Sequence, residues 1–108
     1  MRIEYNKLIR DRIPEIIARD GKTYETEVMG LEEYQQALLT KLVEEAQEAA
    51  AAKPGKLMTE LADLMEVIQA TMQAFEILPE EVQSIQQDRK TNRGGFGKRL
   101  KLIWVENY

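Results

Sequence analysis

Acidic side chains occur in two helix-like segments at positions where a buried helix face normally carries apolar side chains. Glu45 and Glu48 lie three residues apart in the first segment, and Glu60 and Asp63 lie three residues apart in the second. Residues three apart share one face of a helix. At about 100° per residue, Glu45 and Glu60 both fall within the apolar stripe of their segment. A buried carboxylate without a partner costs several kcal/mol, so these acids need a counter-ion.

A divalent cation is the simplest counter-ion for such a cluster. Sites made only of oxygen ligands suit Mg²⁺, with Mn²⁺ as a second possibility. We therefore predict that Glu45, Glu48, Glu60 and Asp63 hold a metal ion. Glu44 lies one residue before the first pair, further round the helix, and could be an outer ligand or the base that deprotonates a water. The competing interpretation is that the acids only form solvated helix faces.

The composition excludes several other kinds of chemistry. The chain of 108 residues has no cysteine and no histidine, which excludes disulfides, thiolate metal sites, cysteine nucleophiles and the usual general base. A net charge of −4 argues against a general binder of nucleic-acid polymers. The N-terminus is too polar for a signal peptide, and no apolar run approaches the roughly 20 residues that span a bilayer. We expect a cytoplasmic protein that does not contact membranes.

The predicted fold is an all-α helical bundle in a single domain, residues 1–108, built on two long helices. These should cover residues 31–52 and 56–75, and Pro54-Gly55 should break the chain between them. A tight connection makes the helices antiparallel neighbours, which brings the two acid pairs together. The apolar stripe of the second helix is wide for so short a chain. We therefore expect self-association, as a dimer or tetramer, to complete the bundle.

Shorter elements should flank this helix pair. Asp11 should cap a short first helix that ends at Gly21. A last helix should begin near Pro79 and fade around residues 90–92. Residues 99–106 begin with alternating apolar and charged side chains, which predicts a short C-terminal β-like segment.

The order of the acids resembles that of a known family. Glu-Glu-x-x-Glu, followed after a short break by Glu-x-x-Asp, is similar to the motif of the all-α nucleoside triphosphate pyrophosphohydrolases, which comprise MazG-type and phosphoribosyl-ATP pyrophosphohydrolase-like proteins. The opening from Tyr5 to Pro14 and the ending from Lys90 to Phe96 resemble one small subgroup. The similarity therefore covers nearly the whole chain.

The resemblance implies hydrolysis of a nucleoside triphosphate between its α and β phosphates, which releases a nucleoside monophosphate and pyrophosphate and could clear unwanted nucleotides. It implies Mg²⁺ at the acids matching the family motif and an assembly of two or more subunits. The water would be positioned by Glu44 or Glu48. The break between the acid pairs is short and alanine-rich, so we expect helix ends that are trimmed relative to larger relatives. We also expect no second domain, which leaves the base selectivity open.

A triphosphate also needs cations. Lys7 and Arg10 precede the first helix, and Lys90 and Arg93 precede a glycine pair. Arginine offers a planar fork to phosphate and lysine a point charge, so we predict that these four residues bind substrate. Each could instead solvate a helix end or offset its dipole.

Two other functions stay open at this point. A non-catalytic interaction or regulatory module would use the acids as a charged docking face. A nucleotide-binding sensor would keep the metal and the nucleotide but would not turn the nucleotide over. Release of pyrophosphate separates the enzyme from both.

Overall fold

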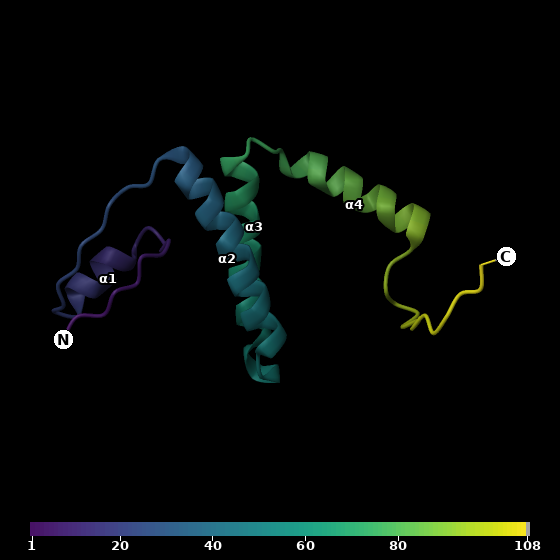
Figure 1. Ribbon diagram of the computed structural model, residues 1–108, viewed down its shortest axis with the longest axis horizontal. Helices are drawn as coiled ribbons and strands as arrows, with labels where there is room; N and C mark the ends of the chain where they lie inside the picture. Colours follow the sequence, from purple (N-terminus) through teal and green to yellow (C-terminus); the bar gives the residue numbers. More distant parts are fainter. Residues whose placement is uncertain (108) are drawn as a thin grey trace. The chain divides into compact units, whose positions relative to one another are not determined.

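The structure is a computed structural model and describes residues 1–107. Its elements are all helical (Figure 1), and no strand forms among the described residues. They are α1 (Ile13–Arg19), α2 (Leu31–Ala51), the 3₁₀ turn η1 (Pro54–Lys56), α3 (Leu57–Ala74) and α4 (Pro79–Arg93). The chain divides into two compact units, of which the first ends at Ile77 and the second begins at Leu78. Compact units need not fold independently, so the single domain stays a prediction.

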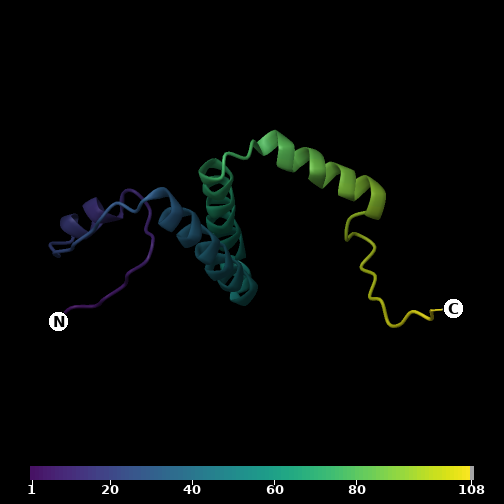
Figure 2. The ribbon, with the colours of Figure 1, turned by 45° about the horizontal axis from the view of Figure 1, so that its top comes forward.

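The first unit is organised by the pair α2 and α3, which lie side by side and run antiparallel (Figures 1 and 2). Lys53 adopts the extended conformation that a following proline favours, with ψ 152°. Pro54 then opens the short turn that leads into α3. At the other end of the pair, the Gln35 side-chain amide donates to the carbonyl oxygen of Ala74 at 2.9 Å. The predicted long helices and their antiparallel arrangement are therefore confirmed.

The N-cap of the short helix α1 is Arg12, one residue after the predicted cap at Asp11. The backbone N–H of Ile13 donates to the carbonyl oxygen of Arg10 at 3.1 Å, and this turn places Arg12 at the N-cap position. The prediction that Asp11 caps the helix is therefore wrong. The predicted end is confirmed, because Gly21 takes the left-handed conformation with φ +76°.

The second unit contains α4 and a non-helical tail. The backbone N–H of Leu78 donates to the Glu81 carboxylate at 3.1 Å, which fixes the first turn. Gly94 follows the helix with φ +84°. The predicted β-like segment is wrong, because residues 99–106 form no strand. A strand needs a backbone partner, and no second strand forms among the described residues of this unit.

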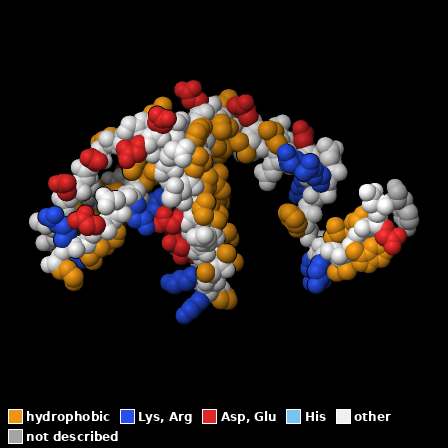
Figure 3. Space-filling model, viewed as in Figure 1, with side chains coloured by type: hydrophobic (Ala, Val, Ile, Leu, Met, Phe, Trp, Pro, Cys, Tyr) orange, Lys and Arg blue, Asp and Glu red, His pale blue; other side chains and the backbone are white. Residues whose placement is uncertain are grey.

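Little of the first unit's apolar surface is buried. Among the described residues only Leu38 and Val67, which face each other's helix from α2 and α3, are buried, at 3% and 9% relative exposure. Figure 3 shows hydrophobic side chains along the visible face of the helix pair. The large apolar side chains that stay exposed on α2 and α3 include Leu39, Val43, Met58, Leu61, Met65 and Ile68. None of the helices within residues 1–107 has the length and apolar character needed to span a bilayer.

Leu38→Ala should lower the free energy of unfolding by about 2–4 kcal/mol, because it leaves a cavity at the best-buried position. Chemical denaturation monitored by circular dichroism measures this change. Leu100→Ala is the matched control: its side chain is 85% exposed, and the loss should stay below about 0.5 kcal/mol. Equal losses in the two variants would contradict the assignment of the core.

Candidate metal centre and substrate site

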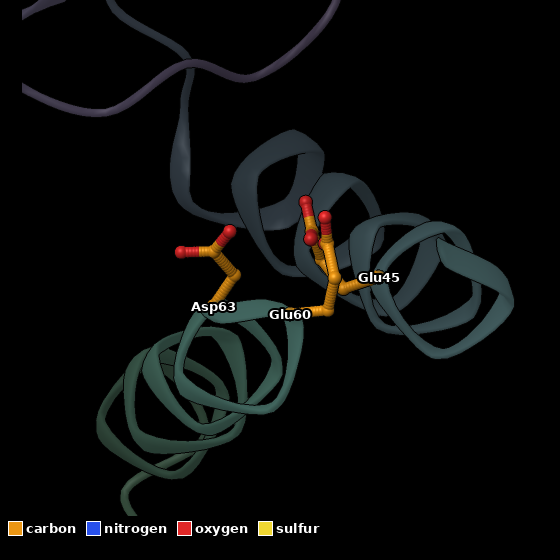
Figure 4. Close-up of side chains that lie close together, drawn as sticks. All are labelled: Glu45, Glu60 and Asp63. Atoms are coloured by element: carbon orange, nitrogen blue, oxygen red, sulfur yellow. The ribbon is translucent and has the colours of Figure 1, made fainter. Parts of the chain in front are cut away.

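Three acids from the two long helices converge on one side of the pair (Figure 4). Glu60 and Asp63 lie one turn apart on α3, and the antiparallel arrangement places Glu45 of α2 opposite them. Each offers one carboxylate oxygen, and these three oxygens all lie within 4.8 Å of one another. We call these three residues the acid cluster. Its spacing suits ligation of one cation by several carboxylates.

One buried oxygen atom of the acid cluster has no hydrogen-bond partner among the described residues. It is the Oε2 atom of Glu60. Leaving a charged oxygen in this state is costly. A hard divalent cation such as Mg²⁺ or Mn²⁺ would satisfy it, since these ions prefer oxygen ligands. The acid cluster therefore fits a divalent cation by both its geometry and its donor chemistry.

Within the acid cluster, Glu45 has a raised pKa. Its side chain is only 13% exposed, and burial raises its pKa; the neighbouring charge of Glu48 raises it further. The ammonium of Lys41 lies 3.8 Å away, one helical turn earlier, which is too far for a strong hydrogen bond. Lys41 therefore offsets the charge of Glu45 only in part, and the pKa of Glu45 stays raised.

The other two predicted acids lie at the margin of the acid cluster. Glu48 is exposed and is not one of the three acids whose oxygens come together, although its charge is felt by Glu45. Glu44 accepts a hydrogen bond from the Lys7 ammonium at 2.7 Å. That bond lowers the pKa of Glu44 and raises the pKa of Lys7. Metal ligation by Glu48 and the catalytic roles of Glu44 and Glu48 stay predictions.

The N-terminal cations contact acids of the site. Arg10 Nη2 donates to Asp63 Oδ1 at 2.9 Å, as Lys7 does to Glu44. We predicted both cations as substrate ligands, and that role stays a prediction. The pairing itself was not predicted from the sequence, although a basic opening segment and an acidic helix pair are a charge signal that could have indicated it. Lys90 and Arg93 lie in the last turn of α4, in the second unit, and their substrate role also stays a prediction.

A hollow lies beside Glu44, between the N-terminal segment and α2. Its volume is about 290 Å³, and it is lined by residues 6–8, Met29 and the α2 residues from Glu33 to Glu44 that face it. Asn6, at φ +48°, turns the chain at its edge in a conformation that asparagine tolerates. Polar side chains of Asn6, Gln36 and Thr40 line it. The types and spacing of these residues match no motif, so the sequence alone does not indicate them.

Comparison with known proteins gives one match. A sequence model for the family described as phosphoribosyl-ATP pyrophosphohydrolase matches residues 3–90. This range includes the N-terminal cations, the two long helices and most of α4. No curated protein and no solved structure matches the chain.

At neutral pH and with a chelator present to remove metal ions, Glu45→Gln should melt a few degrees higher than the unsubstituted chain. The reason is that the pKa of Glu45 is raised in the folded chain, so its charged form opposes folding at pH values above that pKa. The advantage of glutamine should shrink as the pH falls through the pKa of Glu45. Differential scanning calorimetry across a pH series measures both effects.

Glu66→Gln serves as the control, because Glu66 is an exposed acid of α3 outside the acid cluster. Its melting temperature should stay close to that of the unsubstituted chain at every pH. A lower melting temperature for Glu45→Gln at neutral pH would contradict the view that this carboxylate is held under strain.

Proposed function

This chain belongs to the phosphoribosyl-ATP pyrophosphohydrolase family, and we propose that it cleaves a nucleotide between its α and β phosphates with a divalent cation at the acid cluster. The family consists of hydrolases that act on phosphoric anhydrides, so the chain is a pyrophosphohydrolase. The observation that carries the metal proposal is the buried, partnerless Oε2 of Glu60, in a carboxylate group that lies close to two others. We propose Mg²⁺ as the natural ion and Mn²⁺ as its substitute.

The substrate proposed here is a nucleoside triphosphate or a derivative such as phosphoribosyl-ATP. Lys7 and Arg10 are the phosphate-binding cations of the first unit, and Lys90 and Arg93 those of the second. The hollow beside Glu44 offers room for part of the nucleoside, with side-chain amides that can donate and accept hydrogen bonds. Cleavage of a triphosphate would suit an enzyme that clears nucleotides in the cytoplasm.

The chain's own residues have distinct tasks in this reaction. A bound divalent cation would supply positive charge at the phosphate oxygens and make water more acidic. Glu45, Glu60 and Asp63 would hold that ion. The oxygen of water forms a bond to the α phosphorus. The bond from that phosphorus to the oxygen bridging the α and β phosphates breaks, and pyrophosphate leaves. The water proton passes to a carboxylate.

Glu48 is the better candidate for this base. The carboxylate of Glu44 already accepts a hydrogen bond from Lys7, and its lowered pKa makes it a weaker base. Glu48 is exposed and next to Glu45, so it can reach a water at the edge of the acid cluster. Glu44 then acts as an outer acid that orients Lys7.

A panel of ribo- and deoxyribonucleoside triphosphates and phosphoribosyl-ATP, incubated with Mg²⁺ and scored for pyrophosphate, tests the proposal. At least one compound should yield pyrophosphate, and Glu60→Gln should lower the rate at least about 100-fold, because a ligand of the acid cluster is lost. A chelator should abolish the reaction, and Mn²⁺ should restore it.

Glu66→Gln is again the matched control and should keep the full rate. The proposal fails if no compound in the panel yields pyrophosphate, or if Glu60→Gln is as active as the control. Pyrophosphate release that persists in excess chelator would contradict the role of the divalent cation.

We further propose that a second copy of the chain covers the apolar face of α2 and α3. The exposed apolar residues of α3 recur every three or four positions, as on the buried face of a helix bundle. The chain buries too little apolar surface to stabilise the helix pair by itself. A symmetric copy presents the same face, so two such faces satisfy each other.

Sedimentation equilibrium should find a dimer or a tetramer, and Met65→Glu should dissociate it, because a charge on this face would be buried without a partner. Leu102→Glu, on an exposed residue of the second unit, should leave the assembly intact. A monomeric unsubstituted chain would refute the proposed assembly.

A further inference from the structure

Two cations of the N-terminal segment are bonded to acids far away in the sequence. Lys7 and Glu44 are 37 positions apart, and Arg10 and Asp63 are 53 positions apart. The side chains in these pairs are between 32% and 60% exposed. Solvent-exposed ion pairs of this kind are weak, so each can exchange partners readily.

The carboxylate of Asp63 takes part in two interactions that compete with each other. It belongs to the acid cluster, where its oxygen lies near those of Glu45 and Glu60. It also accepts the hydrogen bond from the Arg10 guanidinium. A divalent cation in the acid cluster would place further positive charge beside that guanidinium, and two cations sharing one carboxylate repel each other.

Arg10 can also bind phosphate. Its planar guanidinium can bind two oxygens of a phosphate at once. Its side chain is 60% exposed, so the guanidinium can move without unpacking a core. A phosphate chain held by the same cation would lie beside the acid cluster and offer Arg10 a new partner.

We propose that Arg10 is an exchangeable counter-ion of the acid cluster: it neutralises Asp63, yields that carboxylate to the divalent cation, and transfers to the substrate's phosphates. Lys7, which neutralises Glu44 beside the acid cluster, likewise transfers to the phosphates. This inference rests on the proposed function and adds the order in which the charges are exchanged. It explains why cations suited to phosphate contact acids of the site.

The exchange requires Arg10→Gln to shift two affinities in opposite directions. Mn²⁺ alone should bind about two- to fivefold more tightly, because a competing cation is gone. The complex of Mn²⁺ with inorganic tripolyphosphate should bind about tenfold more weakly, because a charge-assisted hydrogen bond is lost. Isothermal titration calorimetry measures both, and tripolyphosphate avoids dependence on the unknown base. For both ligands, the affinity of Arg10→Lys should lie between that of the unsubstituted chain and that of Arg10→Gln.

Arg12→Gln is the matched control. It removes the same charge two residues away, but Arg12 pairs with Glu15 at 2.6 Å and not with the acid cluster. Both affinities should stay close to those of the unsubstituted chain. If Arg12→Gln matches Arg10→Gln, the effect is one of overall charge and the exchange is refuted.

Other outcomes separate this inference from the proposed function. If Mn²⁺ does not bind the unsubstituted chain, the proposed metal centre fails and the exchange fails with it. If the chain binds Mn²⁺ and releases pyrophosphate while Arg10→Gln leaves the Mn²⁺ affinity unchanged or weakens it, only the exchange fails. Lys7→Gln tests the transfer to phosphate independently: the complex of Mn²⁺ with tripolyphosphate should bind more weakly, whereas the affinity for Mn²⁺ alone should change less than in Arg10→Gln, because Glu44 is not one of the three acids of the cluster.

Discussion

Repulsion among carboxylates held together by two helices is the constraint on which the rest of this structure depends. The tight turn at Pro54 and the packing of Leu38 and Val67 fix the two helices against each other. That arrangement brings three carboxylates within 4.8 Å, with one buried oxygen lacking a partner. Like charges this close oppose folding. The helix pair can therefore persist only where packing and added cations offset the repulsion.

The packing contribution is small. A chain that buries only two side chains among its described residues has a limited reserve of free energy. Ligands that bind the folded state alone add stability by mass action. A divalent cation at the acid cluster and a second copy on the apolar face would both act in this way. If the proposed ion and the second copy bind, metal binding, assembly and folding are linked equilibria.

The helices could be predicted from the sequence because their signals are local. Apolar periodicity, Pro54 and Gly21 each act within a few residues. The convergence of Glu45, Glu60 and Asp63 also follows from local spacing plus one tight connection. The misplaced cap at Asp11 shows the limit, since a backbone turn from Arg10 to Ile13 took the position that a side chain was expected to cap.

Features that depend on distant pairing could not be predicted in this way. The alternation in residues 99–106 predicts a strand only if another strand lies beside it, and the sequence does not specify that partner. The contacts of Lys7 and Arg10 join positions 37 and 53 residues apart, which no spacing rule addresses. Glu48 shares its helix face with Glu45 by spacing. Its exposure in the structure depends on how α2 packs against α3, which spacing along one helix does not specify.

The positions that violate the apolar pattern are also positions at which we propose that a divalent cation binds. An apolar residue at Glu45 or Glu60 would continue the stripe and remove a charge that opposes folding. Such a change would stabilise the helix pair and destroy the oxygen ligands of the acid cluster. Natural proteins accept local violations of this kind at functional sites. The raised pKa of Glu45 and the partnerless oxygen of Glu60 are thus the structural cost of a site that can hold a cation, and the ion pair of Arg10 with Asp63 offsets part of that cost.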